Sequence, residues 1–239
     1  GELMARLEAI DSESYIQARK SNFTSFRWND GEGYNIVVPA TESFFIVKPK
    51  EGCPFDREKT VGFFSKELSA AEKVFAERGF VLDVRNSSTG ASDKSLYDYI
   101  QSYKKNDEMC AVAVDPDCSS YQGGGTEMAH QLRVSCGSGF AEARAEQIPF
   151  LDALDLKNTN SALRIGSRSG DFFRVGVGGF RAGSAAILKK EGDSYRVLFI
   201  GQEGPPCSLL EKEQIPHEVL SSIGGGSCFT DDGRYIRVE

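Results

Sequence analysis

Six cysteines constrain this chain more than any other feature of its 239 residues. Their number is even and none forms a CxxC pair, which favours a disulfide framework over a zinc ribbon or a redox dithiol. Because disulfides persist in oxidising compartments, the pattern predicts an extracytoplasmic protein, either at the cell surface or secreted. The alternative is a cytosolic protein with six thiols. The cysteines are Cys53, Cys110, Cys118, Cys136, Cys207 and Cys228.

The order of the predicted strands suggests how the cysteines pair, although their number alone leaves the connectivity open. Two apolar runs, 109–114 and 131–136, read as neighbouring strands, and each carries one cysteine. A bridge between them would stabilise the fold by about 3–4 kcal/mol through loop closure. A second bridge would pin the loop-rich C-terminal tail. The predicted pairs are Cys110–Cys136, Cys207–Cys228 and, by elimination, Cys53–Cys118.

Composition excludes two broad classes of protein. Apolar residues make up 40% of the chain and charged residues 26%, as in an ordinary globular protein. The net charge is −7 and no Lys/Arg cluster occurs, which argues against a nucleic-acid partner. No apolar run approaches the ~20 residues of a membrane span, so membrane attachment would need a segment outside this sequence.

The N-terminal segment, residues 1–30, reads as a helix or stalk. Met4, Leu7, Ile10 and Ile16 roughly share one face of a helix over residues 4–20. This helix would either descend from a membrane anchor or dock on the protein.

Residues 31–138 are predicted to form a first α+β domain. Pro39 and Pro49 should end strands at 34–38 and 43–47, because proline donates no ladder hydrogen bond. Likewise, Asp115-Pro116 should end the strand at 109–114.

The clearest helix of this first domain is predicted over residues 56–78. Its apolar stripe consists of Phe64, Leu68, Ala71 and Phe75. Gly79 stands where a left-handed C-terminal cap is favoured. A strand follows at 80–84, and residues 96–103 fit either a helix or a strand.

Gly137-Ser138-Gly139 is the predicted domain boundary, because small flexible residues separate two patterned regions there. The second domain, residues 139–239, should open with a helix near 141–156. Its strongest signal is a hairpin that joins 185–188 to 195–200. Further elements are strands at 161–167 and 172–177, helices at 208–214 and 217–222, and a hairpin turn at Asp231-Asp232-Gly233. The predicted class is therefore α+β, with two small antiparallel-sheet domains, covering helices and disulfide staples.

A glycine-rich segment, 176–184, is the one candidate ligand contact. Arg174 and Arg181, with Gly178 and Gly179, could hold an anion. A phosphate loop, however, leads into a helix and carries Gly-Lys-Ser/Thr, whereas a strand pattern follows Ser184 here. A turn between two strands is therefore the commoner interpretation.

No catalytic, metal or cofactor site is predicted. His130 and His217 lie outside any G-x-S-x-G or papain-like context. The carboxylate pairs Asp115/Asp117 and Asp231/Asp232 are better explained by turn chemistry than by acid–base catalysis or Ca²⁺ binding.

Several residues of the C-terminal tail form a pattern similar to that of a known group of proteins. They are the run Tyr195–Cys207 with its Gly201-Gln202 turn, then Ile215-Pro216 and Cys228. This pattern resembles a C-terminal module of bacterial lipoproteins and membrane-anchored surface proteins. The resemblance implies export, a membrane anchor and an α+β fold, without catalytic residues. The chain departs from the pattern in having Tyr195 where such modules often have Trp, and in Gly224–Gly226.

These observations together predict a cell-envelope binding or structural module, with a protein or an envelope polymer as its partner. Two alternatives stay open. A secreted hydrolase would place His130 or His217 beside a nucleophile, or pair two carboxylates. A pilin-like subunit would extend the N-terminal helix.

Overall fold

The structure is a computed structural model that describes residues 5–6, 15–18, 22–28, 33–49, 62, 64–83, 99–120, 128–159, 161–178, 183–220 and 226–237. The chain forms two compact units, each built from two segments. The N-terminal unit comprises Gly1–Phe26 with Val38–Ala141, and the C-terminal unit comprises Arg27–Val37 with Glu142–Glu239.

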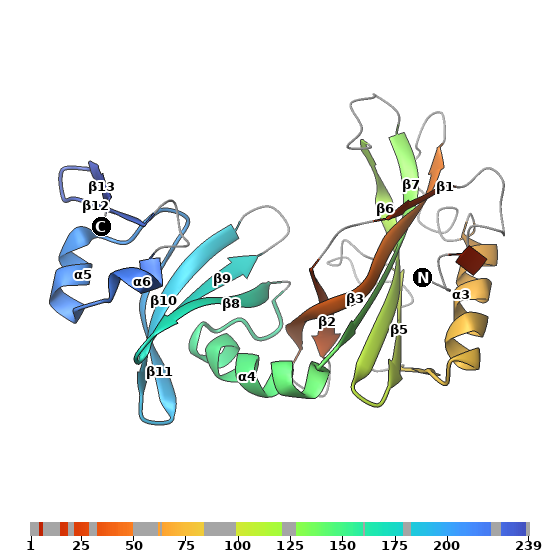
Figure 1. The fold of residues 1–239 in the computed structure, drawn as a ribbon. Coiled ribbons are helices and arrows are strands. Elements are labelled where there is room, and N and C mark those ends of the chain that lie inside the picture. Colours follow the sequence, from red (N-terminus) through yellow and green to blue (C-terminus); the bar gives the residue numbers. More distant parts are fainter. Residues whose placement is uncertain are drawn as a thin grey trace. The chain divides into compact units, whose positions relative to one another are not determined.

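The N-terminal unit is an antiparallel sheet with a helix on one face (Figure 1). Its strands follow the order β3-β7-β6-β5-β4, and β1 and β2 also pair with β3. The elements are β1 (Tyr15–Ala18), β2 (Phe23–Trp28), β3 (Tyr34–Pro49), α3 (Ser65–Glu77), β4 (Val81–Leu82), β5 (Tyr99–Lys105), β6 (Glu108–Ser120) and β7 (Met128–Ser138).

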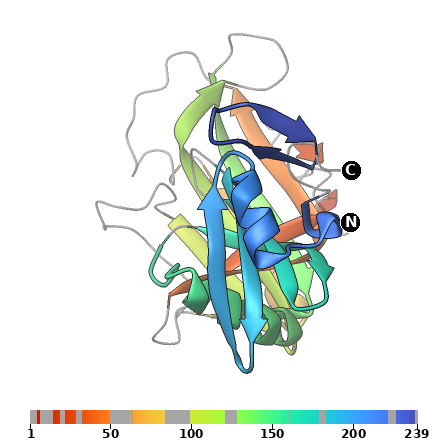
Figure 2. The same ribbon diagram turned by 90° about the vertical axis from the view of Figure 1, so that its left-hand side faces the viewer.

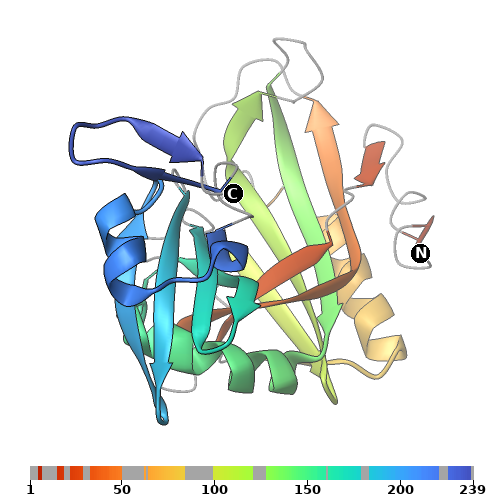
Figure 3. The same cartoon turned by 60° about the vertical axis from the view of Figure 1, so that its left-hand side comes forward.

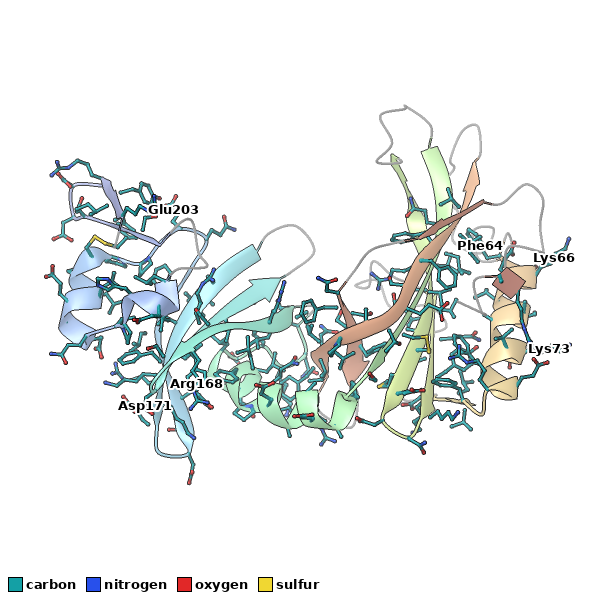
Figure 4. All side chains as sticks on the ribbon, in the orientation of Figure 1. Phe64, Lys66, Lys73, Arg168, Asp171 and Glu203 are labelled. Carbon is teal, nitrogen blue, oxygen red and sulfur yellow. A yellow bond between two sulfur atoms is a disulfide. The ribbon has the colours of Figure 1, made fainter. Side chains whose placement is uncertain are left out.

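Helix α3 packs the predicted apolar stripe against this sheet. Phe64, Leu68, Ala71 and Phe75 are all buried in one cluster with residues of β3, β5, β6 and β7. Figure 4 shows Phe64 on the sheet side of the helix and Lys66 and Lys73 on the opposite side. The prediction of this stripe is confirmed.

Gly79 ends α3 as predicted, in the left-handed conformation with φ of +81°. Its N–H donates to Ala76 O at 2.9 Å, and the Phe80 N–H donates to Phe75 O at 2.9 Å. These two bonds form a Schellman motif, which satisfies carbonyls that the helix end would otherwise leave open.

The Cys110–Cys136 disulfide is confirmed. The two residues stand directly opposite each other in β6 and β7, with Cα atoms 4.0 Å apart. Both are buried in the core cluster beneath α3. Cys53 lies outside the described residues, as does the side chain of Cys118, so the third pair stays a prediction.

Strand β6 does not end at Asp115-Pro116, and that prediction was wrong. It continues to Ser120, because the register shifts between Asp115 and Ser119. Asp115 pairs with Gln131 and Ser119 with Ala129, so three residues bulge opposite His130. A bulge leaves a residue outside the ladder, which is where a strand tolerates proline.

Strand β3 also passes through its predicted end at Pro39. Pairing with β7 begins at Ala40, and pairing with β8 involves Asn35, so Pro39 lies between two sets of ladder bonds. Between these two sets of bonds, the backbone of Val37 is hydrogen-bonded by a side chain. The Gln147 amide accepts from Val37 N at 2.9 Å and donates to Val37 O at 2.6 Å. The strand therefore remains extended through the proline. It ends at Pro49, as predicted.

The helix predicted over residues 4–20 is wrong in its second half. Tyr15–Ala18 form β1, which pairs antiparallel with β3 from Tyr15↔Val47 to Ala18↔Phe44. Helical geometry is present at Ala5 and Arg6. The edge of β3 offers hydrogen bonds to a β-branched and aromatic segment, and this tertiary pairing overrides a weak helical pattern.

The C-terminal unit packs helices on both faces of an antiparallel β8-β9-β10-β11 sheet (Figures 1 and 2). On one face, Phe150 of α4 stacks with Phe173 and Tyr195 at 5.2 and 4.3 Å between ring centroids. On the other, α5 and α6 cover Ile187. The elements are α4 (Phe140–Ala153), β8 (Ala162–Ser169), β9 (Phe172–Gly178), β10 (Gly183–Glu191), β11 (Ser194–Gly201), α5 (Cys207–Glu213), α6 (His217–Leu220), β12 (Ser227–Phe229) and β13 (Tyr235–Arg237).

The predicted hairpins of this unit are confirmed. β10 pairs with β11 from Ala185↔Gly201 to Glu191↔Ser194, with Gly192 at φ of +64° in the turn. β12 pairs with β13 across Asp231-Asp232-Gly233, where φ of +81° requires the glycine.

The α+β class is confirmed, whereas the predicted separation into two antiparallel sheets is not. Strand β3 serves both units: its N-terminal end pairs parallel with β8 at Asn35↔Ala162, and its C-terminal part pairs with β7. Residues 31–138 and 139–239 remain predictions as domain boundaries. Within the predicted linker, Gly137 is paired on both sides, and a Cβ there would stand 2.4 Å from Val38 Cγ2.

Candidate binding cleft

The C-terminal tail folds into a small module because two backbone segments approach closely. Gly204 has no room for a side chain, since a Cβ would lie 2.4 Å from the Ser227 carbonyl oxygen. Two residues later Pro206 forms a parallel bridge with Phe229, whose N–H donates to Pro205 O at 3.0 Å. The glycine and prolines of the tail thus align β12 beside the chain that enters α5.

The Cys207–Cys228 disulfide, predicted from sequence, fastens the same two segments. It joins the first residue of α5 to the middle of β12, with Cα atoms 5.0 Å apart. Cys228 is buried in a cluster with the core sides of both helices. The other buried members are Ile187, Leu210, Ile215, Val219 and Leu220.

The chain turns sharply between α5 and α6. Gln214 caps α5 in the left-handed conformation, with φ of 54°, and Ile215 N–H donates to Leu210 O at 3.0 Å. Pro216 then leads into α6, which the Ser167 hydroxyl anchors to β8 by donating to Val219 O at 2.8 Å. This path turns Ile215 into the core and leaves His217 exposed.

A cleft of about 560 Å³ opens between this turn and the β12–β13 hairpin. Its size lies in the range of ligand sites in proteins. Figure 3 shows the hairpin next to α5, and Figure 4 shows the disulfide between them. Leu210, Ile215, Pro216, Ile236 and the disulfide form its apolar part. Glu211, Gln214, His217 and Arg237 are its exposed polar lining.

Two opposite charges of this lining remain available to a ligand. Within the described part of the chain, neither the Glu211 carboxylate nor the Arg237 guanidinium forms an ion pair or a side-chain hydrogen bond. Charged groups just outside the cleft behave differently, because they are engaged with neighbours.

Arg196 and Glu213 form one of these outer pairs, which links β11 to α5. Arg196 donates to Glu213 Oε2 at 2.8 Å and to Glu191 Oε1 at 2.7 Å. The hydrogen bond from Arg196 lowers the pKa of Glu213, and the hydrogen bonds to Glu213 and Glu191 raise the pKa of Arg196.

The hairpin turn has its own network. Hydrogen bonds from Thr230 and then from Arg234 lower the pKa of Asp232, with Arg234 Nε at 2.7 Å from Asp232 Oδ2. The Tyr235 hydroxyl donates to Glu203 Oε2 at 2.7 Å, and this bond raises the pKa of Tyr235. These bonds hold β13 in place over the cleft.

Of the predicted anion contact, the described residues Arg174 and Gly178 do not line this cleft. Arg174 and Gly178 belong to β9, and Gly178 pairs with Gly183 at the start of β10, so the segment is a hairpin between strands. Burial lowers the pKa of Arg174. Gly179 and Arg181 lie outside the described residues.

The hydrolase alternative finds little support at the cleft. His217 lines it, yet the lining residues that the structure describes include no Ser, Thr or free Cys, and Glu211 is the one carboxylate among them. His130 pairs with Lys48 in the sheet of the N-terminal unit, and its side chain lies outside the described residues. The described residues that line this cleft therefore form neither a nucleophile–base pair nor a carboxylate pair.

The disulfide beside the cleft was predictable from the sequence, whereas the residues that face a ligand were not. The Cys207–Cys228 pair was predicted, and Ile215-Pro216 was noted as part of the resemblance. Glu211, Ile236 and Arg237 were not, because short polar helices and three-residue strands give no distinctive pattern.

Comparison of the chain with protein-family models, with curated proteins and with solved structures finds no match. Across the described ranges, no helix combines the length and the apolar character needed to cross a membrane.

Proposed function

We propose that the chain is an extracytoplasmic module of a cell-surface or secreted protein that binds a peptide segment of another protein in the C-terminal cleft. The observation that carries the proposal is the cleft itself. An apolar floor lies beside two exposed, oppositely charged groups, Glu211 and Arg237, that have no internal ion pair in the described chain. Peptides present this combination of an apolar side chain with charged and polar neighbours.

The cellular location rests on the disulfides. Two bridges, one in each compact unit, fit an oxidising environment. A protein exported to the cell envelope would meet partners there, as the lipoprotein-like tail pattern also implies. The pilin-like alternative loses its main support, because Tyr15–Ala18 lie in a strand rather than in a continuous helix.

Ile236 provides a direct test of the proposed function. It lines the cleft and is 50% exposed, so Ile236→Glu should leave the core intact. Ile200, 52% exposed on β11 and outside the cleft lining, gives a matched control in Ile200→Glu. A random peptide library would be selected on the wild-type protein, and each selected peptide tested on both variants by calorimetry.

We expect selected peptides to bind Ile236→Glu ~tenfold or more weakly, because a bound peptide would bury the new carboxylate in an apolar site at a cost in free energy. The same peptides should bind Ile200→Glu with the affinity of the wild type. Selection of no peptide, or of peptides that bind both variants equally well, would overturn the proposal.

A further inference from the structure

The β12–β13 hairpin has one covered edge and one outer edge. β12 lies between β13 and the chain at Pro206, to which it is bridged through Phe229. Within the described ranges, β13 pairs with β12 alone. All three residues of β13 are exposed. The outer edge of β13 is therefore a short strand edge of the kind that accepts another strand.

Hydrogen bonds within the hairpin identify the backbone groups at this edge. The Phe229 N–H points away from β13, because it donates to Pro205 O. Residues directly opposite in an antiparallel pair point their N–H and C=O groups the same way, either both toward or both away from each other. Tyr235, which is opposite Phe229, therefore directs its N–H and C=O outward, and so does Arg237 two residues later.

The intervening residue links this edge to the cleft. Ile236 stands opposite Cys228, so both side chains are on the same face of the hairpin. Both residues line the cleft. A strand beside β13 would thus place every second side chain next to Ile236, on the cleft side, while its backbone bonds to Tyr235 and Arg237.

Charge indicates the chemistry of the added strand. Residues 203–239 hold seven acidic and three basic residues, in a chain of net charge −7. Arg234 is already paired with Asp232, and Glu213 with Arg196. Among the described cleft residues, Glu211 and Arg237 both remain without an ion pair, so the cleft lining itself favours neither sign of charge. The acidic excess of residues 203–239 decides the sign, and a peptide with Lys or Arg next to its apolar residues complements that excess.

We infer that the ligand of the cleft is a basic, extended peptide that adds as a strand to the outer edge of β13, with alternate apolar side chains in the cleft. This inference rests on the proposed function and specifies its ligand. Backbone hydrogen bonds would contribute affinity, and the cleft would contribute specificity, as in other strand-addition complexes.

The test uses the full chain and a synthetic peptide, acetyl-Lys-Val-Lys-Val-Lys-Val-Lys-amide. Two further peptides carry N-methyl groups on every Val amide or on every Lys amide. Because successive N–H groups of a strand point to opposite edges, only one of these two sets can face β13. A fourth peptide has Glu in place of every Lys. Binding would be measured by calorimetry at low salt and again at high salt.

We expect the unmodified peptide to bind, and only one methylated peptide to lose ~tenfold or more of this affinity. In an antiparallel complex the Lys-methylated peptide fails, and in a parallel complex the Val-methylated peptide fails. The Glu peptide should bind at least ~tenfold more weakly than the Lys peptide, with a difference that shrinks in high salt.

Equal affinities of the two methylated peptides would overturn strand addition while leaving a peptide-binding cleft in place. An unbound Lys peptide, when library peptides still bind in an Ile236-dependent manner, would overturn the basic ligand alone. Absence of any Ile236-dependent peptide would remove the proposed function itself.

Discussion

The two disulfides among the described residues are similar in loop length and different in surroundings. Their cysteines are 26 and 21 residues apart, so closure of either loop contributes about 3–4 kcal/mol. Cys110–Cys136 crosses two strands that are already paired along their length, beneath α3. Cys207–Cys228 joins a short helix to a three-residue strand with few backbone bonds of its own.

This difference indicates that the effect of a disulfide on stability depends on the other interactions that hold the same segments together. The sheet around Cys110 would keep its ladder and lose stability as a whole. The tail around Cys228 would keep only the short β12–β13 pairing, the bridge from Pro206 to Phe229 and the Tyr235–Glu203 bond, so it would lose a larger share of what positions it. Removal of the first bridge should therefore act globally, and removal of the second should act locally, on the cleft.

The largest effect is expected from Cys110→Ala with Cys136→Ala. The free energy of unfolding should fall by about 3–4 kcal/mol or more, because loop closure is lost and two buried side chains are truncated. Urea denaturation followed by circular dichroism would measure it. A loss below ~1 kcal/mol would show that the paired strands make this bridge redundant.

Cys207→Ala with Cys228→Ala should have a smaller global effect and a strong local one. We expect amide hydrogen exchange to accelerate in α5, β12 and β13, while protection in β5, β6 and β7 remains near that of the wild type. Affinity for cleft peptides should fall at least ~tenfold, because loss of the bridge frees one wall of the cleft. Uniform loss of protection in both units would contradict the comparison.

Two tightly packed glycines, one in the sheet of the N-terminal unit and one in the C-terminal tail, test the same comparison without changing a disulfide. A Cβ at Gly137 would stand 2.4 Å from Val38 Cγ2 and 2.9 Å from Pro39 O, and one at Gly204 would stand 2.4 Å from Ser227 O. Each substitution to alanine should cost about 1–3 kcal/mol by overpacking. Gly137→Ala should lower the midpoint of global unfolding, whereas Gly204→Ala should chiefly weaken peptide binding.

Gly176→Ala is the control for both glycine variants, since its nearest contact would be 3.9 Å away. It should leave the midpoint and the affinity unchanged. If Gly204→Ala lowered the midpoint of global unfolding as much as Gly137→Ala, the tail would unfold together with the rest of the chain, and the comparison would be wrong.

The smallest expected effect concerns pH. The hydrogen bond from Arg196 lowers the pKa of Glu213 below its ordinary value, so the ion pair contributes stability above that ordinary pKa and loses it as pH falls through the folded-state pKa. Arg196 is largely exposed, so the contribution is small. Carboxyl NMR titration should find the pKa of Glu213 depressed in the wild type and restored toward its ordinary value in Arg196→Met. An unchanged pKa in that variant would contradict the assignment.

Elements that depend on residues close together in the chain could be predicted from the sequence, whereas features that depend on contacts between distant residues could not. The stripe of α3 and its Gly79 cap follow from local geometry, because a helix of period 3.6 shows its buried face in the sequence. The β10–β11 hairpin and the Asp231-Asp232-Gly233 turn follow from turn chemistry. Pro39 and Pro116 misled the prediction, since Pro116 lies in a bulge and Pro39 lies between the β8 and β7 pairings of β3.

The candidate site shows the same limit more sharply. Its frame depended on cysteines and prolines that are visible in the sequence. Its ligand-facing surface depends on Glu211, Ile236 and Arg237, which come from α5 and β13 and are brought together by pairing and by the bridge. The glycine-rich segment drew attention because of its composition, yet its described ends lie in β9 and β10, where Gly178 pairs with Gly183.

The sequence by itself determined the α+β class, the principal helices and hairpins, and two of the disulfide pairs, because each of these depends on residues close in the chain or on strands recognisable by their own pattern. Only the tertiary structure decided that Tyr15–Ala18 form a strand, that β3 serves both units, and that a cleft opens beside β13. Those features depend on which distant backbone groups and side chains meet. A local pattern does not encode such meetings, since the free energy of pairing exceeds the small differences in intrinsic propensity.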